Sequence, residues 1–577
     1  MSGSRPRSAA EQQCIPAATE SPRMGGWAIV MALLAACAAP SRGQEEGVRI
    51  SLGQSGLSAL RYGGGDVLYD GEPLVTGAFF RKWDGAVYAA DVGAGKRSMS
   101  RAEQRCEWAY PWGRIGLRYR PEGSRLYLSV DISTERDADT LVALYLRIAE
   151  VRFRTVPTFR NRSFFFYGNT TMAHNIGGPG VVGAEYDGGT VVLCNEQMGR
   201  PLSFGFGDST DGKAALRYPV LAYTGRHPML KEKWPFIDRP VYPGGTDHFE
   251  LSIRFGPAGS ASGDLADDLY QRFAETYPLR LSWDDRRPIG RLFLSSSHKT
   301  LADNYATNPR GWFNDKEIDV TTEEGRAQFR ERLMKWADRA VEVCTEMDAQ
   351  GVIAWDPEGQ EHPHMISYLG DARSLPPEME PLADEFFGRF SEAGLRTGIC
   401  IRPQRPVRTA YGDRVFQLKF TDRRELLANL SKKIEAARER WGCTLFYMDS
   451  NVHWYGDPVR IPEAEGHTAM VDDELMRQLT AKYPDILLVP EWETLRTYAY
   501  CAPYSQLNYN KLTEPPAHVL RTYAEALLVN AADLKTAEAQ RDELVTAVKR
   551  GDILFFQGWY PARENAVIKS IYEEARK

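Results

Sequence analysis

The first half of the chain alternates apolar and polar positions in short runs that end at Gly, Asp or Pro. Runs such as RLYLSVDIS (125–133), GTVVLC (189–194) and HFELSIRFG (248–256) are rich in β-branched and aromatic residues. A period of two places successive side chains on opposite faces of a strand, so each run predicts a half-buried β-strand. Residues 46–260 are therefore expected to form an all-β sandwich. Residues 261–286 predict one linker helix followed by an extended connection.

The second half changes to the period of a helix. Thr321, with Glu324 three residues later, fits a capping box at a helix start. The segment that follows carries one apolar face at helical spacing, formed by Phe329, Leu333, Trp336, Ala340, Val343, Cys344 and Met347. Further amphipathic segments at 376–394, 423–442, 472–484, 537–551 and 564–576 predict helices.

Short apolar runs lie between these helices. Strand candidates centre near residues 292, 353, 398, 445, 487, 507, 527 and 553. Alternating β and α units with continuously apolar strands are typical of a parallel sheet covered by helices. Eight units over residues 287–577 favour a closed (β/α)8 TIM barrel over an open doubly wound sheet. No GxGxxG or GxxxxGK[ST] motif follows a strand, which argues against a phosphate-binding loop. The fold class is thus multidomain: an all-β sandwich followed by an α/β barrel.

Composition fits a soluble globular protein. The chain has 577 residues, 26% charged and 43% apolar, with a formal net charge of -6. This length predicts two large domains or three smaller ones. The negative balance gives no support to a nucleic-acid partner. Aromatic residues reach 11%, with 13 Trp and 27 Tyr, as expected of large β-rich cores or of surfaces on which sugars stack.

Residues 1–45 resemble an export signal. The apolar run GGWAIVMALLAACAAPSRG follows Arg5, Arg7 and Arg23 and is too short to remain as a membrane-spanning helix. The string from Leu34 to Cys37 resembles the lipobox of bacterial lipoproteins, in which the cysteine is lipidated. Lipidation at Cys37 and simple secretion are both open. We expect an exported protein, periplasmic, outer-membrane-anchored or extracellular, that contacts a membrane only through such an anchor.

Polar and aromatic residues follow several predicted barrel strands. In a barrel the carboxyl ends of the strands share one mouth, where active sites are assembled. The relevant residues are Asp356, Glu358, Glu361, His362 and His364 after the second strand, Arg402, Gln404 and Arg405 after the third, Asp449, Asn451, His453, Trp454 and Tyr455 after the fourth, Glu491, Trp492 and Glu493 after the fifth, and Gln557, Gly558, Trp559 and Tyr560 after the eighth.

This collection suits hydrolysis of a glycosidic bond. That reaction needs a proton donor for the leaving oxygen and a second carboxylate that attacks the anomeric carbon or activates water. We expect Asp449 to be the nucleophile and Glu491 the acid/base, their side chains about 5 to 10 Å apart in one pocket. We assign substrate binding to Asp356, Glu358, Arg402, His453, Trp454, Trp492, Glu493, Gln557 and Trp559. The alternative for each acid is a cap or a loop ion pair.

A metal site is the competing chemistry after the second strand. Asp356, His362 and His364 are suitable ligand types, which leaves a metal-dependent hydrolase open. No HExxH helix is present, and the whole chain has only 9 His. We therefore expect no metal and no cofactor, with a carbohydrate as the partner. Six scattered cysteines outside the leader, without CxxC spacing, are expected to be small buried hydrophobes.

The segment FYMDSN (446–451) carries a family resemblance. A β-sandwich followed by a (β/α)8 barrel whose fourth strand ends in Asp resembles the retaining α-glycosidases of the α-galactosidase, α-glucosidase and α-fucosidase type. The resemblance implies that Asp449 is the nucleophile and that the enzyme acts on α-linkages with retention. Two departures are plain: the acid/base of the α-galactosidase and α-glucosidase group follows the sixth strand, and no C-terminal β-domain follows the barrel here. A non-catalytic carbohydrate-binding protein is the second interpretation.

Overall fold

The structure is a computed structural model. The two halves that differ in their pattern of apolar positions form two different kinds of sheet in it. It describes residues 47–84, 86–153, 171–175, 181–186, 188–198, 202–206, 216–225, 240–295, 306–360, 368–408, 415–420, 422–449, 471, 473–491, 495–506, 521–523, 528–530, 534–556 and 565–577. Within these ranges the first half is antiparallel β-structure and the second half is a parallel sheet with helices.

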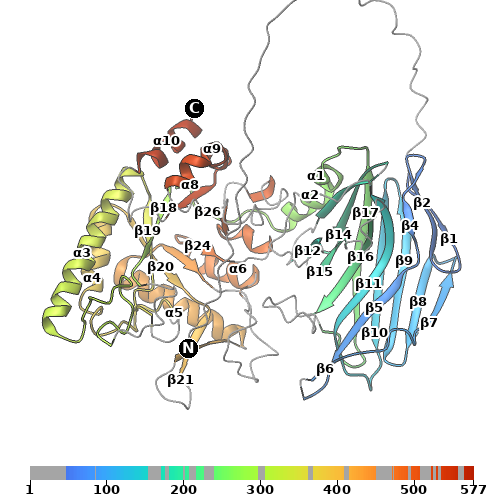
Figure 1. The fold of residues 1–577 in the computed structure, drawn as a ribbon, viewed down its shortest axis with the longest axis horizontal. Helices are drawn as coiled ribbons and strands as arrows, with labels where there is room; N and C mark the ends of the chain where they lie inside the picture. The colour runs from blue at the N-terminus through green and yellow to red at the C-terminus, as the bar shows by residue number, and fades with distance from the viewer. Residues whose placement is uncertain are drawn as a thin grey trace, which may run out of the picture. The chain divides into compact units, whose positions relative to one another are not determined.

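Two antiparallel sheets form the first half (Figure 1). One runs in the order β13 (Val181–Tyr186), β14 (Gly189–Asn195), β17 (Thr246–Gly256), β10 (Arg125–Thr134), β9 (Gly113–Glu122), β8 (Arg105–Tyr110) and β7 (Lys96–Ser100). The other runs β12 (Thr171–Asn175), β15 (Leu202–Phe206), β16 (Leu216–Gly225), β11 (Thr140–Phe153), β5 (Leu74–Arg81) and β6 (Val87–Ala89), with β4 (Leu68–Asp70) also paired to β11. A small sheet joins β1 (Arg49–Leu52), β2 (Leu57–Tyr62) and β3 (Gly65–Asp66).

The alternation in the sequence is what gives these sheets a shared core. Along β10, Leu126, Leu128, Val130 and Ile132 are buried and the residues between them are half-exposed. They pack in one cluster with residues of β11 and β5 from the other sheet, such as Leu144. Apolar faces of two sheets that bury each other form a sandwich. The predicted all-β first half is confirmed.

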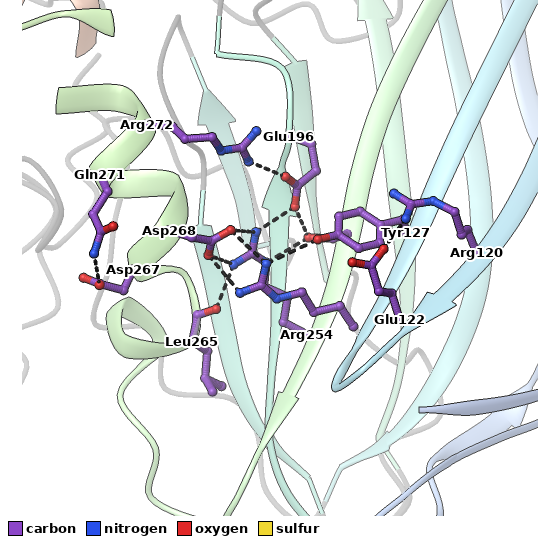
Figure 2. A network of polar contacts seen from close by, with 12 residues as sticks. Arg120, Glu122, Tyr127, Glu196, Arg254, Leu265, Asp267, Asp268, Gln271 and Arg272 are labelled. Atoms are coloured by element: carbon purple, nitrogen blue, oxygen red, sulfur yellow. Dashed lines mark hydrogen bonds and ion pairs between the residues drawn. The ribbon is translucent and has the colours of Figure 1, made fainter. Parts of the chain in front are cut away.

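The linker region contains two short helices, α1 (Ser262–Leu265) and α2 (Asp267–Thr276), where one had been expected. Arg254 of β17, whose side chain is 1% exposed, ties them to the sheet. Figure 2 shows its guanidinium between Glu196, at 2.8 Å, and Asp268, while one nitrogen donates to the carbonyl of Leu265 at 2.9 Å. A buried guanidinium needs such partners because its charge cannot be neutralised by deprotonation.

The second half contains all eight strands predicted for the barrel, joined into one sheet of parallel pairs. Its order is β24 (Leu487–Pro490), β23 (Leu445–Met448), β20 (Arg396–Ile401), β19 (Gly351–Trp355), β18 (Ile289–Phe293), β27 (Ile553–Phe556), β26 (Leu528–Asn530) and β25 (Tyr504–Gln506). Each strand lies within a few residues of its predicted centre.

This sheet is strongly curled. β23 and β25 are six strands apart in the sheet order, so in a flat sheet they would be separated by roughly 29 Å at about 4.8 Å per strand. The rings of Tyr447 on β23 and Tyr504 on β25 nevertheless have centroids 5.5 Å apart. At the seam, Ala502 N donates to Leu488 O of β24 at 3.0 Å. The two edges of the sheet therefore approach each other.

Helices cover the outside of this sheet, and Figure 1 shows α3 and α4 beside β19 and β20. They are α3 (Glu323–Glu346), α4 (Ala383–Glu392), α5 (Arg423–Trp441), α6 (Asp473–Lys482), η3 (Leu495–Ala499), α8 (Leu534–Ala539), α9 (Arg541–Lys549) and α10 (Ala566–Ala575). A hairpin of β21 (Gln404–Arg408) and β22 (Val415–Lys419) follows β20. None of the helices within the described residues is long and apolar enough to cross a membrane.

The predicted capping box at α3 is wrong by one residue. Thr322 is the N-cap, and its hydroxyl accepts from Gly325 N at 3.1 Å. Thr321 is engaged by Asp319, whose Oδ1 accepts from the Thr321 backbone N–H at 2.8 Å and from its hydroxyl at 2.5 Å. An Asx turn just before the helix thus competes with the capping box for this threonine.

Candidate functional site

Side chains on the inner face of the curled sheet change from apolar to polar at the carboxyl ends of the strands. The buried inner residues form one cluster that includes Ile289, Ile353, Trp355, Cys400, Leu445, Tyr447, Leu487, Val489, Tyr504, Leu528, Ile553 and Phe555. The residues that alternate with them, such as Val352, Ile399 and Phe446, pack with the helices. Continuing the inner series by two residues gives Arg402, Asp449 and Glu491 on three neighbouring strands.

Asp449 is the centre of this polar group. Its backbone N–H donates to Ile401 O at 2.9 Å, which continues the parallel ladder past β23. Three donors converge on Oδ2: the Tyr368 hydroxyl at 2.5 Å, Arg402 Nε at 2.9 Å and Arg402 Nη2 at 2.5 Å. The side chains of Arg402 and Asp449 are only 4% and 13% exposed. Asp449 is therefore a deeply placed carboxylate held by charge-assisted bonds.

Asp449 and Glu491 are in direct contact. Burial alone would raise the pKa of Asp449, but the positive charge of Arg402, with hydrogen bonds from Glu491, Tyr368 and Arg402 itself, lowers that pKa well below its ordinary value of 3.8. A hydrogen bond between two carboxyl groups requires a proton that the two groups share. The two acids expected to act together thus lie side by side at the ends of the neighbouring strands β23 and β24.

Arg402 also lies against an aromatic ring. Its Cζ lies 4.4 Å from the centroid of the Tyr368 ring, the same tyrosine whose hydroxyl reaches Asp449. Guanidinium groups stack favourably on such rings. Arg402 was expected to bind substrate; in the structure it contacts Asp449 and Tyr368.

A buried lysine fixes the backbone around these residues. Lys433 of α5 is 1% exposed, and its Nζ donates to the carbonyls of Leu369, Arg402 and Gln404 at 3.1, 2.7 and 3.0 Å. Burial lowers the pKa of Lys433 to about 8, although nearby Asp371 and Glu358 oppose this. One ammonium group therefore joins the end of β20 to the segment that carries Tyr368.

Asp356, expected to bind substrate, is buried and contacts residues that follow β18 and β19. The residue is 1% exposed and has a positive φ of 46°. Its carboxylate accepts from Leu294 N at 3.3 Å, from Gln360 Nε2 at 2.8 Å and from the Ser295 hydroxyl. Burial raises its pKa to about 6 in spite of these donors. In this arrangement Asp356 stabilises the ends of β18 and β19.

Glu358 has a similar position in the segment after β19. Its Oε1 accepts from the backbone N–H groups of Leu369 and Gly370 at 2.5 and 2.6 Å. Burial raises the pKa of Glu358, with those backbone donors acting in the opposite direction. Because Leu369 follows Tyr368 directly, Glu358 helps to place the tyrosine that reaches Asp449.

The floor beneath these acids is aromatic and carries one more cation. The ring centroids of Trp355 and Tyr447 are 4.6 Å apart, and those of Tyr504 and Phe555 are 6.0 Å apart. Arg291 of β18 lies among them, with Cζ 5.0 Å from the Trp355 ring and Nη1 3.4 Å from the Tyr504 hydroxyl. The acids thus lie above a packed aromatic layer.

Most of the other predicted site residues lie outside the described residues. These are His453, Trp454, Trp492, Glu493, Gln557 and Trp559 for the substrate, His362 and His364 for a metal, and Cys37 for lipidation. Within the described ranges no group of three or more His, Cys, Asp and Glu is placed to hold a metal ion. The six cysteines from Cys106 to Cys501 are buried, as predicted, and within the described residues none of them forms a disulfide.

Sequence reasoning missed Tyr368 and Lys433. Lys433 had a readable signal, since it occurs on the apolar stripe of its helix, three residues after Leu430 and four before Ala437. A lysine in such a stripe must reach a polar partner or it would be expelled from the core. Tyr368 follows a Gly- and Pro-containing segment with no periodicity to show where it points.

Comparisons with known proteins find likeness in structure. No family model matches the sequence, and no curated protein matches it. An α-N-acetylgalactosaminidase from Bifidobacterium bifidum superposes with a TM-score of 0.52 at 13% identity, covering 92% of each chain. GH36 α-galactosidase AgaB from Geobacillus stearothermophilus gives 0.44 at 10%, covering 93% of this chain and 75% of the other, and an α-galactosidase from Lactobacillus brevis gives 0.40 at 10%, covering 93% and 72%. The first of these likenesses shows a shared fold.

Proposed function

We propose that the protein is a glycoside hydrolase that cleaves α-linked sugars at the carboxyl ends of its parallel strands. The observation that carries the proposal is the pair of contacting carboxyls: Asp449, whose pKa is lowered and whose carboxylate is held by Arg402 and Tyr368, with Glu491 hydrogen-bonded to it. Glycoside hydrolysis needs one carboxylate and one carboxylic acid. The fold shared with an α-N-acetylgalactosaminidase supports the same class and makes an α-linked galactosyl or N-acetylgalactosaminyl group the first substrate to test.

The two carboxyls would act in sequence. Asp449 attacks the anomeric carbon while Glu491 gives its proton to the leaving oxygen, which yields a glycosyl ester on Asp449 and a free alcohol. Glu491, now a carboxylate, takes a proton from water as the water attacks the anomeric carbon. The bond from that carbon to Asp449 breaks, which frees the carboxylate and releases the sugar with its configuration retained. The separation of retaining pairs is about 5 to 5.5 Å, so the glycosidic oxygen enters between the two groups and replaces their hydrogen bond.

The scaffold for this chemistry would be a closed (β/α)8 barrel. Contact between rings on β23 and β25, with the backbone bond from Ala502 to Leu488, supports closure between β24 and β25. The aromatic side chains after strands four, five and eight, Trp454, Trp492 and Trp559, would then form a rim for the sugar. We also propose export through the leader, with Cys37 as the lipidation site if an anchor is retained.

A non-catalytic sugar-binding protein is the second candidate. It is favoured by the buried ion pair of Arg402 with Asp449, because this pair already occupies the carboxylate that would have to attack the sugar. A carboxylate that only binds sugar can remain in this ion pair, because it never has to attack a substrate.

Turnover by carboxyl variants tests the two candidates. We would assay a panel of aryl α- and β-glycosides, including the α-galactoside and α-N-acetylgalactosaminide, with wild type, Asp449→Asn and Glu491→Gln. Asp449→Asn should lower kcat/KM at least about 10³-fold. Asp485→Asn is the matched control, because Asp485 is 58% exposed and precedes β24 at the end opposite Glu491. Sugar binding without turnover by the wild type would establish the second candidate, and unchanged turnover by Asp449→Asn would move the chemistry elsewhere.

A further inference from the structure

The sandwich carries a polar hollow that plays no part in the proposed hydrolysis. It lies on β8, β9, β10 and β17 and encloses about 550 Å³, within the range of roughly 300 to 1,000 Å³ usual for small-molecule sites. Its charged lining consists of Arg105, Glu107, Arg114, Asp131, Asp247 and His248. These side chains belong to strands remote in sequence from the barrel.

A glycine creates the hollow. Gly116 of β9 pairs with Glu107 on one side and Asp131 on the other, so the row of side chains has a gap between two acids. A Cβ on Gly116 would lie 2.5 Å from Arg105 Nη2. The guanidinium uses this gap to reach Glu107 at 3.1 Å and Asp131 at 4.0 Å. The floor therefore presents donors and acceptors side by side.

The far wall is a histidine between two carboxylates. His248 Nδ1 lies 2.7 Å from Asp131 Oδ1, and Nε2 lies 2.8 Å from Glu250 Oε1. Burial lowers the pKa of His248, but the hydrogen bonds to Asp131 and Glu250 outweigh it and raise that pKa above the ordinary 6.5. The His248 and Asp131 side chains are 42% and 47% exposed, so a ligand can reach both. Arg114 of β9 also lines the hollow and is exposed.

We propose that this hollow binds a neutral saccharide, as a second carbohydrate site on the sandwich. Its lining offers the guanidinium groups of Arg105 and Arg114 and the ring of His248, interleaved with the carboxylates of Glu107, Asp131 and Asp247. A sugar hydroxyl both donates and accepts, so adjacent hydroxyls match such an alternation. Because the hollow lies on a rigid antiparallel sheet, these groups are held in place before the ligand arrives.

The same lining opposes the other small ligands. An inorganic phosphate would be attracted by the two guanidinium groups but repelled by the three carboxylates. A metal cation would be attracted by the carboxylates but repelled by the guanidinium groups. Because both signs of charge line the hollow, a ligand without net charge meets no net repulsion on entering.

The test is calorimetric titration of the full-length Asp449→Asn protein, in which hydrolysis should not consume the ligand. The probes are raffinose, maltotriose, cellotriose and xylotriose, with inorganic phosphate and trigalacturonate as charged comparisons. We expect at least one neutral trisaccharide to bind in a manner that Arg114→Ala weakens about tenfold or more. Arg118→Ala is the matched control, since Arg118 is exposed on the same strand and face but does not line the hollow; it should change the affinity by less than about twofold.

Two results would overturn the proposal: no neutral trisaccharide whose binding depends on Arg114, or Arg114-dependent binding of phosphate or trigalacturonate in its place. The proposal stands apart from the hydrolysis, because a variant in the hollow leaves the barrel carboxyls untouched. Binding lost in Arg114→Ala with turnover intact in an otherwise wild-type chain would separate the two sites.

Discussion

At the scale of single residues, the state of Asp449 decides what the site can do. Its folded pKa lies below the ordinary value of 3.8, since Arg402 and its hydrogen-bond donors outweigh burial. A depressed carboxyl pKa contributes stability that is present at neutral pH and lost as pH falls through the folded value. The same depression keeps Asp449 ionised, as a nucleophile must be.

Tyr368→Phe tests this electrostatic account. With one donor fewer on Oδ2, the Asp449 carboxylate is less stabilised and its pKa rises, so the acidic limb of the kcat/KM profile should move to higher pH by up to about one unit. The unfolding free energy should fall by about 1 to 2 kcal/mol. Chemical denaturation and a pH–rate series measure the two effects.

Tyr483→Phe is the matched control for that change. Its hydroxyl also donates to a carboxylate, Glu435, at 2.7 Å, but it lies among the outer helices. It should lose similar stability and leave the acidic limb in place. A limb that moves equally in both variants, or in neither, would contradict the role given to Tyr368.

At the scale of elements, α5 supports the site through one residue. Asp422 caps the helix by accepting from Arg424 N and Glu425 N, and Gly442 ends it with φ of 65°. Lys433 lies between these two ends, on the apolar face of the helix. Its ammonium group binds three backbone carbonyls near Arg402 and Tyr368. The helix therefore covers the sheet and also fixes the end of β20, whose Arg402 binds Asp449.

Lys433→Met should be strongly destabilising, by about 3 kcal/mol or more, because it leaves three carbonyls without their donor. It should also change the pH dependence of unfolding. The pKa of Lys433 is about 8 in the folded chain against an ordinary 10.5, so the unfolded chain binds more protons between these values and stability from this group rises with pH there. That rise should disappear in Lys433→Met.

Lys432→Met provides the comparison, since Lys432 is the exposed neighbour on the same helix. Denaturant titrations of both variants between pH 7 and pH 10 measure the effect. Equal stability losses in the two variants would show that the carbonyl contacts of Lys433 have no special weight.

At the scale of the whole molecule, the positions of the strands along the chain could be predicted from the sequence better than the side-chain contacts between them. Runs such as GVIAW and RTGICI became β19 and β20 with no change of bounds, because short, wholly apolar segments flanked by polar residues have few alternatives to a buried strand. The contact of Tyr368 with Asp449 could not be foreseen, since Tyr368 follows a segment without periodicity. Arg402 reaches Asp449 because β20 and β23 are neighbours in the sheet, an order that the sequence alone does not state. The capping box failed for a local reason, the competing Asx turn at Asp319.

Curling of the sheet is also the premise of the proposed chemistry. Asp449 and Glu491 end neighbouring strands, and Tyr447 below them meets rings from β25 and β27. We propose that Asp449 is the nucleophile of a retaining enzyme that acts on α-linkages.

Azide rescue tests this claim most directly. Asp449→Gly, given azide and an aryl α-glycoside that the wild type hydrolyses, should regain turnover and release the β-glycosyl azide, because azide enters from the face that the carboxylate has vacated. NMR of the product gives its anomeric configuration. An α-glycosyl azide would instead mark Asp449 as the acid/base, and undiminished hydrolysis by Asp449→Gly without azide would show that Asp449 takes no part in the reaction.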